Sequence, residues 1–304
     1  MHKLNSLLMM IIVFFFGGCG NDAPSPENGS VEFNGSIKLE KITELDSRLK
    51  ETSGMLVVDG KVYTHNDSGN RPYLYEINTT NGEIVRSIHI KGATNRDWED
   101  LAQDDNYIYI ADTGNNMGNR KDLNIYRVSK RDLLNSDDIP SESIKITYAD
   151  QSSFSYSDHT TPFDAEALMA LDGSLYLFSK NWNDCTTNVY KIPAIPGSYK
   201  IYPLFKHKLN VMVTAADYDP STNSIVLIGY ANIYKNILSS SMIFVLSNYS
   251  KNDFFSGTLL ALKIKNATDA GQIEAVGFRD GAKGGLFISA EGNPAMLYKA
   301  SVTQ

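Results

Sequence analysis

Carboxylates recur in this chain at one point of a repeated pattern, near the start of short apolar runs. Asp97 is followed closely by Glu99, Asp164 by Glu166, and Glu274 stands at the same point of another segment. Carboxylates with this spacing serve as oxygen ligands for hard cations, or as an acid and base pair in hydrolysis. Glu99 and Glu166 are therefore the candidate catalytic pair.

The acidic segments belong to a set of five that recur with a period of roughly fifty residues. They are Glu51–Met55, Asp97–Leu101, Asp164–Leu168, Thr214–Tyr218 and Gln272–Val276. Each precedes a second apolar run, namely Lys61–Asp67, Asn106–Asp112, Ser174–Lys180, Ser224–Tyr230 and Gly285–Glu291. A repeat of this length without helical periodicity predicts an all-β fold, a β-propeller with one repeat per blade.

Five blades of four strands account for the segments better than six, because no sixth inner-strand segment is found. The last repeat has three strands after Gln272, and a spare strand, Ser36–Glu44, stands at the start. We expect this N-terminal strand to complete the last blade and close the ring, which removes open sheet edges. Six blades remain the alternative, and Gln151–Thr161 is interpreted as a surface excursion.

In a propeller, the starts of the innermost strands and the ends of the second strands lie on one face, close to the axis. The candidate metal ligands on this face are Asp67, Asp97, Glu99, Asp112, Asp164 and Glu166. The candidate ligand-binding residues are Lys180, Trp182, Tyr230, Glu274 and Glu291. Many carboxylates with few His and Cys favour Ca²⁺ or Mg²⁺ over zinc. Alternatively, the aspartates cap their own turns and the glutamates accept hydrogen bonds from neighbouring blades.

Other chemistries have weaker support. Trp98 is expected in the packing between blades, whereas Trp182 follows Lys180 in a polar loop and is the better candidate for ligand contact. No G-x-S-x-G motif occurs, and Ser53 with His65 is the remaining candidate for a nucleophile and its base.

The first residues indicate a leader rather than part of the fold. Leu7–Phe16 is an apolar stretch too short to span a bilayer, and Cys19 follows two glycines. This arrangement resembles the lipobox of bacterial lipoproteins, which implies acyl chains such as palmitate on Cys19. The expected organisation is a signal peptide over 1–18, the lipidated cysteine and a flexible tether over 19–35, and one propeller domain over 36–304.

A formal net charge of −7 argues against nucleic-acid binding, which requires a basic surface. We expect a monomer in the cell envelope, held to a bacterial membrane by its lipid. The outer membrane is favoured, with the domain facing the periplasm or the exterior.

Several segments resemble a group of bacterial secreted and lipoprotein β-propellers that are compared with NHL-type or phytase-like propellers. They are His65–Gly69, Asp97–Leu101, Ile110–Asn116, Asp164–Leu168 and Thr214–Tyr218. The resemblance implies the fold, but it names no activity. Propeller phytases bind several Ca²⁺ ions through acidic residues and need a basic phosphate pocket, for which this chain offers Lys180 with Arg96 or Arg120.

Two functions follow from these residues. The first is a membrane-tethered protein that binds a glycan, peptide or protein at an acidic face with bound Ca²⁺. The second is a metal-dependent hydrolase of phosphoesters or glycosides that uses the same carboxylates.

Overall fold

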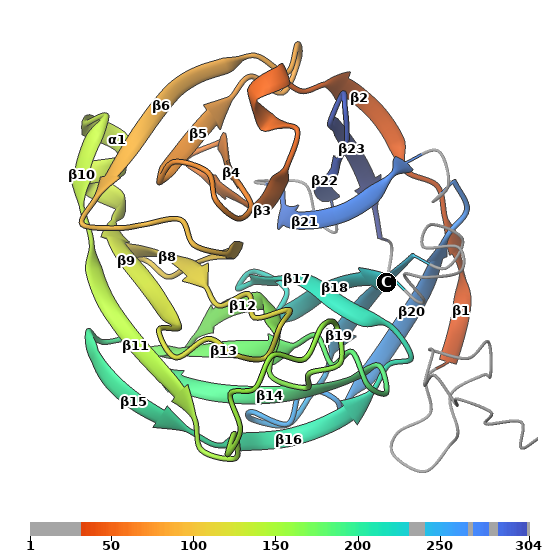
Figure 1. The fold of residues 1–304 in the computed structure, drawn as a ribbon. Coiled ribbons are helices and arrows are strands. Elements are labelled where there is room, and N and C mark those ends of the chain that lie inside the picture. The colour runs from red at the N-terminus through yellow and green to blue at the C-terminus, as the bar shows by residue number, and fades with distance from the viewer. Residues whose placement is uncertain (1–31, 231–240, 267–269, 280–284, 303–304) are drawn as a thin grey trace, which may run out of the picture.

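Short runs rich in Ile, Val, Leu and Tyr, bounded by Gly, Asn and Asp, fold as strands because branched and aromatic side chains pack well on a pleated surface. Five sheets of such strands stand around a central axis (Figure 1). This computed structural model describes residues 32–230, 241–266, 270–279 and 285–302. The prediction of a five-bladed β-propeller is confirmed, and the six-bladed alternative is wrong.

Each blade contains four antiparallel strands, ordered below from the axis outward. Blade one has β3 (Thr52–Val58), β4 (Lys61–Asn66), β5 (Tyr73–Ile77) and β6 (Ile84–Lys91). Blade two has β7 (Trp98–Gln103), β8 (Tyr107–Asp112), β9 (Asn124–Ser129) and β11 (Glu142–Tyr148). Blade three has β12 (Ala165–Leu171), β13 (Ser174–Ser179), β14 (Thr186–Pro193) and β16 (Pro203–Lys208). Blade four has β17 (Met212–Asp219), β18 (Ser224–Tyr230), β19 (Met242–Ser247) and β20 (Thr258–Ile264).

Blade five joins the two ends of the chain. It has β21 (Gln272–Phe278), β22 (Gly285–Glu291), β23 (Met296–Ser301) and, outermost, β2 (Glu40–Glu44), which pairs antiparallel with β23. An N-terminal strand therefore closes the ring, as expected. The expected strand Ser36–Glu44 is nevertheless two strands, because β1 (Glu32–Ile37) pairs in parallel with β20 of blade four.

Three strands fasten neighbouring blades to one another. β1, β10 (Asp138–Pro140) and β15 (Gly197–Ile201) each precede the outermost strand of one blade and pair in parallel with the outermost strand of the blade before it. The sequence from Tyr199 to Phe205 is for this reason divided between β15 on blade two and β16 on blade three. The sequence pattern alone does not show which sheet receives such a strand.

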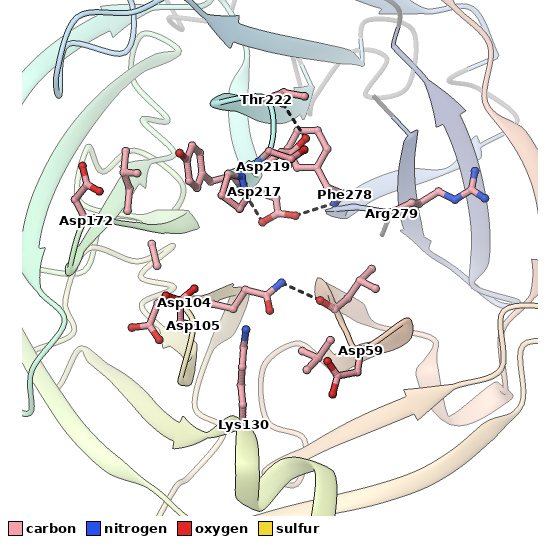
Figure 2. A pocket seen from close by; sticks show the side chains of 18 of the residues that line it. Asp59, Asp104, Asp105, Lys130, Asp172, Asp217, Asp219, Thr222, Phe278 and Arg279 are labelled. Carbon is pink, nitrogen blue, oxygen red and sulfur yellow. Dashed lines mark hydrogen bonds between the residues drawn. The ribbon is translucent and has the colours of Figure 1, made fainter. Parts of the chain in front are cut away.

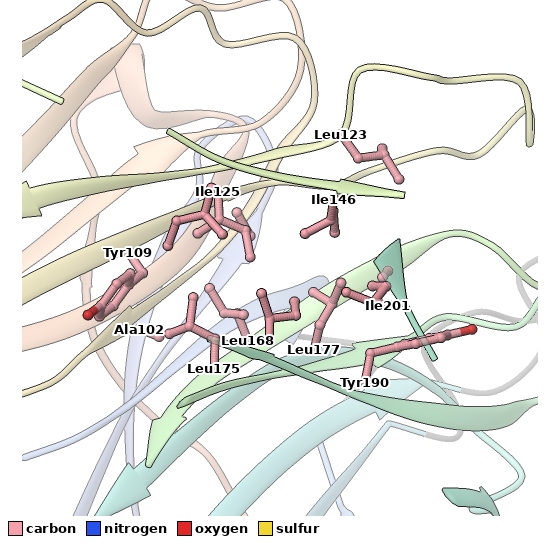
Figure 3. Packing of buried hydrophobic residues seen from close by; sticks show 14 of the residues in the cluster. Ala102, Tyr109, Leu123, Ile125, Ile146, Leu168, Leu175, Leu177, Tyr190 and Ile201 are labelled. Carbon is pink, nitrogen blue, oxygen red and sulfur yellow. The ribbon is translucent and has the colours of Figure 1, made fainter. Parts of the chain in front are cut away.

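The core lies between adjacent blades. Figure 3 shows Leu168, Leu175 and Leu177 of blade three packed with Ile125 and other apolar residues of blade two. Trp98 is fully buried between blades one and two, where its indole N–H donates to the Thr94 carbonyl at 2.9 Å. Its expected role in packing is thus correct.

Two helices are short: the 3₁₀ helix η1 (Ser47–Leu49) and α1 (Lys130–Asn135). Among the described residues, no helix has the length and apolar character needed to cross a membrane. The leader, Cys19 and most of the expected tether lie outside the described residues, although β1 begins at Glu32, within the segment expected to be tether.

Candidate metal centre

The inner strand of every blade carries a register shift at the same level. The residues at these shifts are Gly54, Glu99 with Asp100, Glu166, Thr214 and Glu274. A β-bulge takes a residue out of the regular alternation and re-aims its side chain. The bulges thus account for glutamates from three blades that face the axis.

The position of the bulge in β17 shows which residues of blade four correspond to those of the other blades. Thr214 holds the position that Glu99, Glu166 and Glu274 hold in their blades. The segment of blade four that corresponds to Asp97–Leu101 therefore begins at Met212, two residues before the predicted start at Thr214. Thr214 donates its hydroxyl to the Ile273 carbonyl at 3.2 Å, so blade four supplies no acid at this level.

The bulged residues open onto a cavity of about 180 Å³ at this end of the axis. Its walls are Ser53, Asp67, Glu99, Asn116, His159, Glu166, Lys180, Trp182, Tyr230, Gln272, Glu274 and Glu291. The structure therefore brings together the five expected ligand-binding residues, both candidate catalytic glutamates and Asp67. His159 was not singled out from the sequence, because this loop residue carries no periodic signal.

Two groups of three carboxylates meet at Glu99. The first consists of Asp67, Asp97 and Glu99, and the second of Glu99, Asp164 and Glu166; within each group one oxygen per residue lies within 4.8 Å of the others. Five of the six expected metal ligands therefore belong to one or both of these groups. The sixth, Asp112, belongs to neither group; it accepts from Arg120 at 2.9 Å and from the Asp97 N–H at 3.0 Å.

The second group already has donors from the protein. Asp164 accepts from the Asn115 N–H at 2.6 Å and from the Trp182 indole at 2.7 Å. Glu166 accepts from the Lys180 ammonium at 2.6 Å. These contacts compensate two buried carboxylates, so this group needs no further cation.

The first group lacks such donors. Within the described part of the chain, no N–H or O–H group is hydrogen-bonded to the Asp97 or Glu99 carboxylate, and Asp67 accepts from the adjacent Ser68 N–H. Glu99 is only 5% exposed. A buried charge without a partner is costly, so this group is where a cation has the most to neutralise.

The loop after β8 leaves room for the first group. A Cβ at Gly114 would collide with the Glu99 and Asp97 carboxylates, so glycine is required there by their position. Asn116, two residues on, has a buried amide oxygen for which the described residues supply no hydrogen-bond donor, and it lines the same cavity. Amide oxygens are common calcium ligands.

Lys180 links the opposite walls of the cavity. Besides Glu166, its ammonium donates to the Tyr230 hydroxyl at 3.0 Å, and Tyr230 in turn donates to Glu274 at 3.0 Å. Lys180 also lies 4.9 Å from the centre of the Trp182 ring, and His159 meets that ring edge-on at 4.5 Å. Trp182 is therefore partly covered by the protein itself.

Burial and mutual repulsion shift the protonation of these carboxylates. Burial, with the neighbouring Asp97 charge, raises the pKa of Asp67 to about 7. Burial and Asp164 raise the pKa of Asp97 to about 6, and burial and Glu166 place the pKa of Glu99 well above its ordinary value. Without a cation, part of the group is protonated at neutral pH.

Asp100 is a residue whose role the sequence did not indicate. Its fully buried carboxylate accepts the backbone N–H groups of Leu101 at 2.8 Å, and of Leu168 and Ala216 at 2.9 Å each. Blade two is thereby tied to blades three and four across the axis.

The candidate nucleophile pair is not formed: Ser53 donates to the Glu99 carbonyl, and the His65 ring bonds the Asn66 carbonyl at 3.0 Å.

A larger cavity of about 1220 Å³ opens at the other end of the axis (Figure 2). Its aspartates include Asp59, Asp104 and Asp172 in the turns that join the first and second strands of their blades. Asp104 caps its own turn, since its carboxylate accepts the N–H groups of Asn106 and Tyr107 at 2.8 Å each. Hydrogen bonds of this kind within a turn explain an aspartate at such a position without a ligand.

No family model matches the sequence, and no curated protein matches it. Among solved structures, the chain is similar to a glutaminyl cyclase from Myxococcus xanthus, with 14% identity and a TM-score of 0.53 over 88% of this chain and 99% of that chain. It also matches a GH43 β-1,3-galactosidase, with 11% identity and a TM-score of 0.46 over 88% of this chain and 95% of that one. The likeness to the cyclase shows the fold alone. Membership of the lipoprotein propeller group stays a prediction.

Proposed function

We propose that this propeller binds a hard divalent cation, Ca²⁺, between Asp67, Asp97 and Glu99, and uses that face to bind an extracellular or envelope ligand. The observation that carries the proposal is the buried carboxylate of Glu99, which receives no donor from the described residues and lies within 4.8 Å of two other carboxylates. The amide oxygen of Asn116 is a further candidate ligand atom on the same wall. Oxygen ligands alone, in this number, suit Ca²⁺.

The ligand, a glycan, peptide or protein segment, meets polar atoms next to the cation. An ammonium has three N–H donors, and Lys180 commits two of them to Glu166 and Tyr230. The remaining donor and the open positions of the cation favour a carbonyl or hydroxyl oxygen. Stacking of a sugar on Trp182 requires His159 to move aside, because His159 packs against that ring.

The hydrolase alternative has less support. A glycosidase needs two carboxyl groups that are free to exchange protons with substrate and water, whereas Glu166 is held by the Lys180 ammonium at 2.6 Å. A phosphoester needs positive partners, yet Lys180 is paired with Glu166 and Arg120 with Asp112. The geometry therefore favours binding over hydrolysis.

The cation site is tested by calorimetric titration of metal-free protein with Ca²⁺. We expect one strong site that Glu99→Gln weakens roughly tenfold or more, since one of three charged ligands is lost. Glu142→Gln, on the exposed outer strand of blade two, serves as the control and should leave the affinity unchanged. Wild-type protein without a Ca²⁺ site would overturn the proposal. Chelator-sensitive turnover of phosphoester or glycoside substrates, lost in Glu99→Gln, would favour the hydrolase instead.

The location in the cell envelope is a separate part of the proposal and rests on the sequence around Cys19. Expression of the full chain in a bacterial host should give a membrane-associated protein whose N-terminal peptide carries acyl chains. Cys19→Ser should remove those chains. An unmodified Cys19 peptide in the wild type would contradict the anchor and leave the cation site untouched.

A further inference from the structure

We infer that the outer rim where blades two and three meet rests on a membrane surface that carries anionic lipids. The rim consists of five outward-facing residues, from β15, from β16 and from the short connection between these strands. They are Lys200, Tyr202, Leu204, Lys206 and Lys208. The inference is independent of the cation site and of any lipid on Cys19.

The sequence around this rim has an unusual charge for the protein. From Cys185 to Ala216 it contains four lysines and no Asp or Glu, although the whole chain has 35 acidic residues. Lys191 also belongs to this stretch and is exposed. A basic region in an otherwise acidic protein indicates an anionic partner.

The strand pattern places the rim residues on one face. Along β16 exposed residues alternate with Phe205, which is half-buried, and His207, which is buried. Successive side chains of a strand point to opposite faces, so Leu204, Lys206 and Lys208 share the outward face. Figure 1 shows β15 and β16 at the outside of the ring.

Apolar side chains on the same rim point to a lipid surface. Five large apolar side chains are exposed in the described part of the chain, and two of them, Tyr202 at 66% and Leu204 at 46%, belong to the rim. A third, Ile195 at 62%, lies in the same stretch of sequence, before β15. Exposed tyrosine and aliphatic side chains flanked by lysines are the composition of proteins that lie in the headgroup region. A soluble polyanion would use the lysines but not the apolar side chains.

Protection of an open sheet edge explains only part of this arrangement. β16 is the edge of its sheet, and lysines on an edge strand discourage pairing with other chains. That role requires no exposed Tyr202 or Leu204. Lys206 also pairs with Asp184 at 3.1 Å, but both side chains are about half exposed, so this pair is weak and does not withdraw the lysine from a membrane.

The test is co-sedimentation of the full chain with vesicles, all proteins carrying Cys19→Ser so that no acyl chain contributes. With about 30% phosphatidylglycerol we expect binding roughly a hundredfold tighter than to neutral phosphatidylcholine, since three rim lysines contribute about fivefold each, and a loss of that difference in about 0.5 M NaCl. Lys206→Glu with Lys208→Glu should reduce binding to the anionic vesicles more than roughly tenfold, since each lysine contributes about fivefold. Tyr202→Ser with Leu204→Ser should reduce it by roughly threefold or more.

The matched control is Lys41→Glu with Lys299→Glu on the outer strands of blade five. These exposed lysines pair with Glu44 and Glu40, and their substitution changes the net charge by the same amount. An equal loss of binding in the control would reduce the effect to net charge and overturn the inference. Binding to heparin without preference for anionic vesicles would assign the rim to a soluble polyanion instead.

Discussion

Lys180 donates to the carboxylate of Glu166 at 2.6 Å, and Glu99, whose carboxylate lies beside Glu166, has no donor of its own among the described residues. The Lys180 ammonium therefore supplies positive charge to the half of the cavity that blades three to five build. The carboxylates of the half built by blades one and two receive no ion pair from the described residues. The blades are alike in fold but differ in charge, and this difference places the proposed metal beside the carboxylates of blades one and two.

Removing the Glu99 charge should stabilise the metal-free protein while it weakens Ca²⁺ binding. Glu99→Gln eliminates a buried carboxylate without a partner, a penalty of about 1–3 kcal/mol. We expect the melting temperature in chelator at about pH 8 to rise by roughly 2–6 °C. Scanning fluorimetry measures this, with Glu142→Gln as control. A lower melting temperature would mean that Glu99 makes structural contacts that outweigh its charge.

The metal-free protein should lose stability as the pH rises. The pKa of Asp67 is about 7 in the folded state against an ordinary 3.8, so the folded protein holds a proton that the unfolded chain has released. The free energy of unfolding therefore falls between about pH 4 and pH 7. Bound Ca²⁺ replaces the proton, so its stabilising effect should be larger at about pH 8 than at about pH 5. Thermal unfolding with chelator or Ca²⁺ at both values checks this, and an effect of Ca²⁺ that is larger at the lower pH would contradict it.

The Lys180–Glu166 pair should behave as a buried ion pair. Lys180→Met leaves Glu166 without its cation and should lower the free energy of unfolding by about 3–5 kcal/mol. Adding Glu166→Gln removes the stranded charge and should recover most of that loss. Urea denaturation of both single variants and the double variant gives the coupling. Losses that simply add would show that the two side chains act independently.

Asp100 should be the strongest single contributor to stability near the axis. Asp100→Ala leaves three buried backbone N–H groups without an acceptor, each at a cost of about 1–3 kcal/mol. We expect a loss above about 3 kcal/mol by urea denaturation, and a smaller loss for Asp100→Asn, which keeps one oxygen. Asp105→Ala, in an exposed turn of the same blade, is the control. A change similar to the control would mean that water replaces the carboxylate.

The repeat predicted the fold because every blade buries the same apolar inner strands. It also predicted the shared face, since alternating strand direction requires Glu99, Glu166 and Glu274 to meet near one end of the axis. It did not predict the bulges, and a bulge changes the register by one residue. The pattern of a strand repeats every two residues, so the sequence also allowed the segment of blade four to be placed two residues too late, which put Thr214 in the wrong position.

The sequence also did not predict that the carboxylates form one group with donors from the protein and one group without them. Which carboxylate receives Lys180, and whether Trp182 is open or covered by His159, depends on loops that no periodicity describes. The parallel strands β1, β10 and β15 were missed for a similar reason. A short run of branched residues predicts a strand but does not identify its partner.

The pairing of β2 with β23 has a consequence for how the chain reaches its native state. About 250 residues separate the two strands. At ordinary rates of synthesis, β23 is therefore made on the order of ten to fifty seconds after β2. Until β23 is made, blade five lacks its outer pair and the ring stays open. A chain that stops before β23 therefore exposes this sheet edge, and exposed edges favour aggregation.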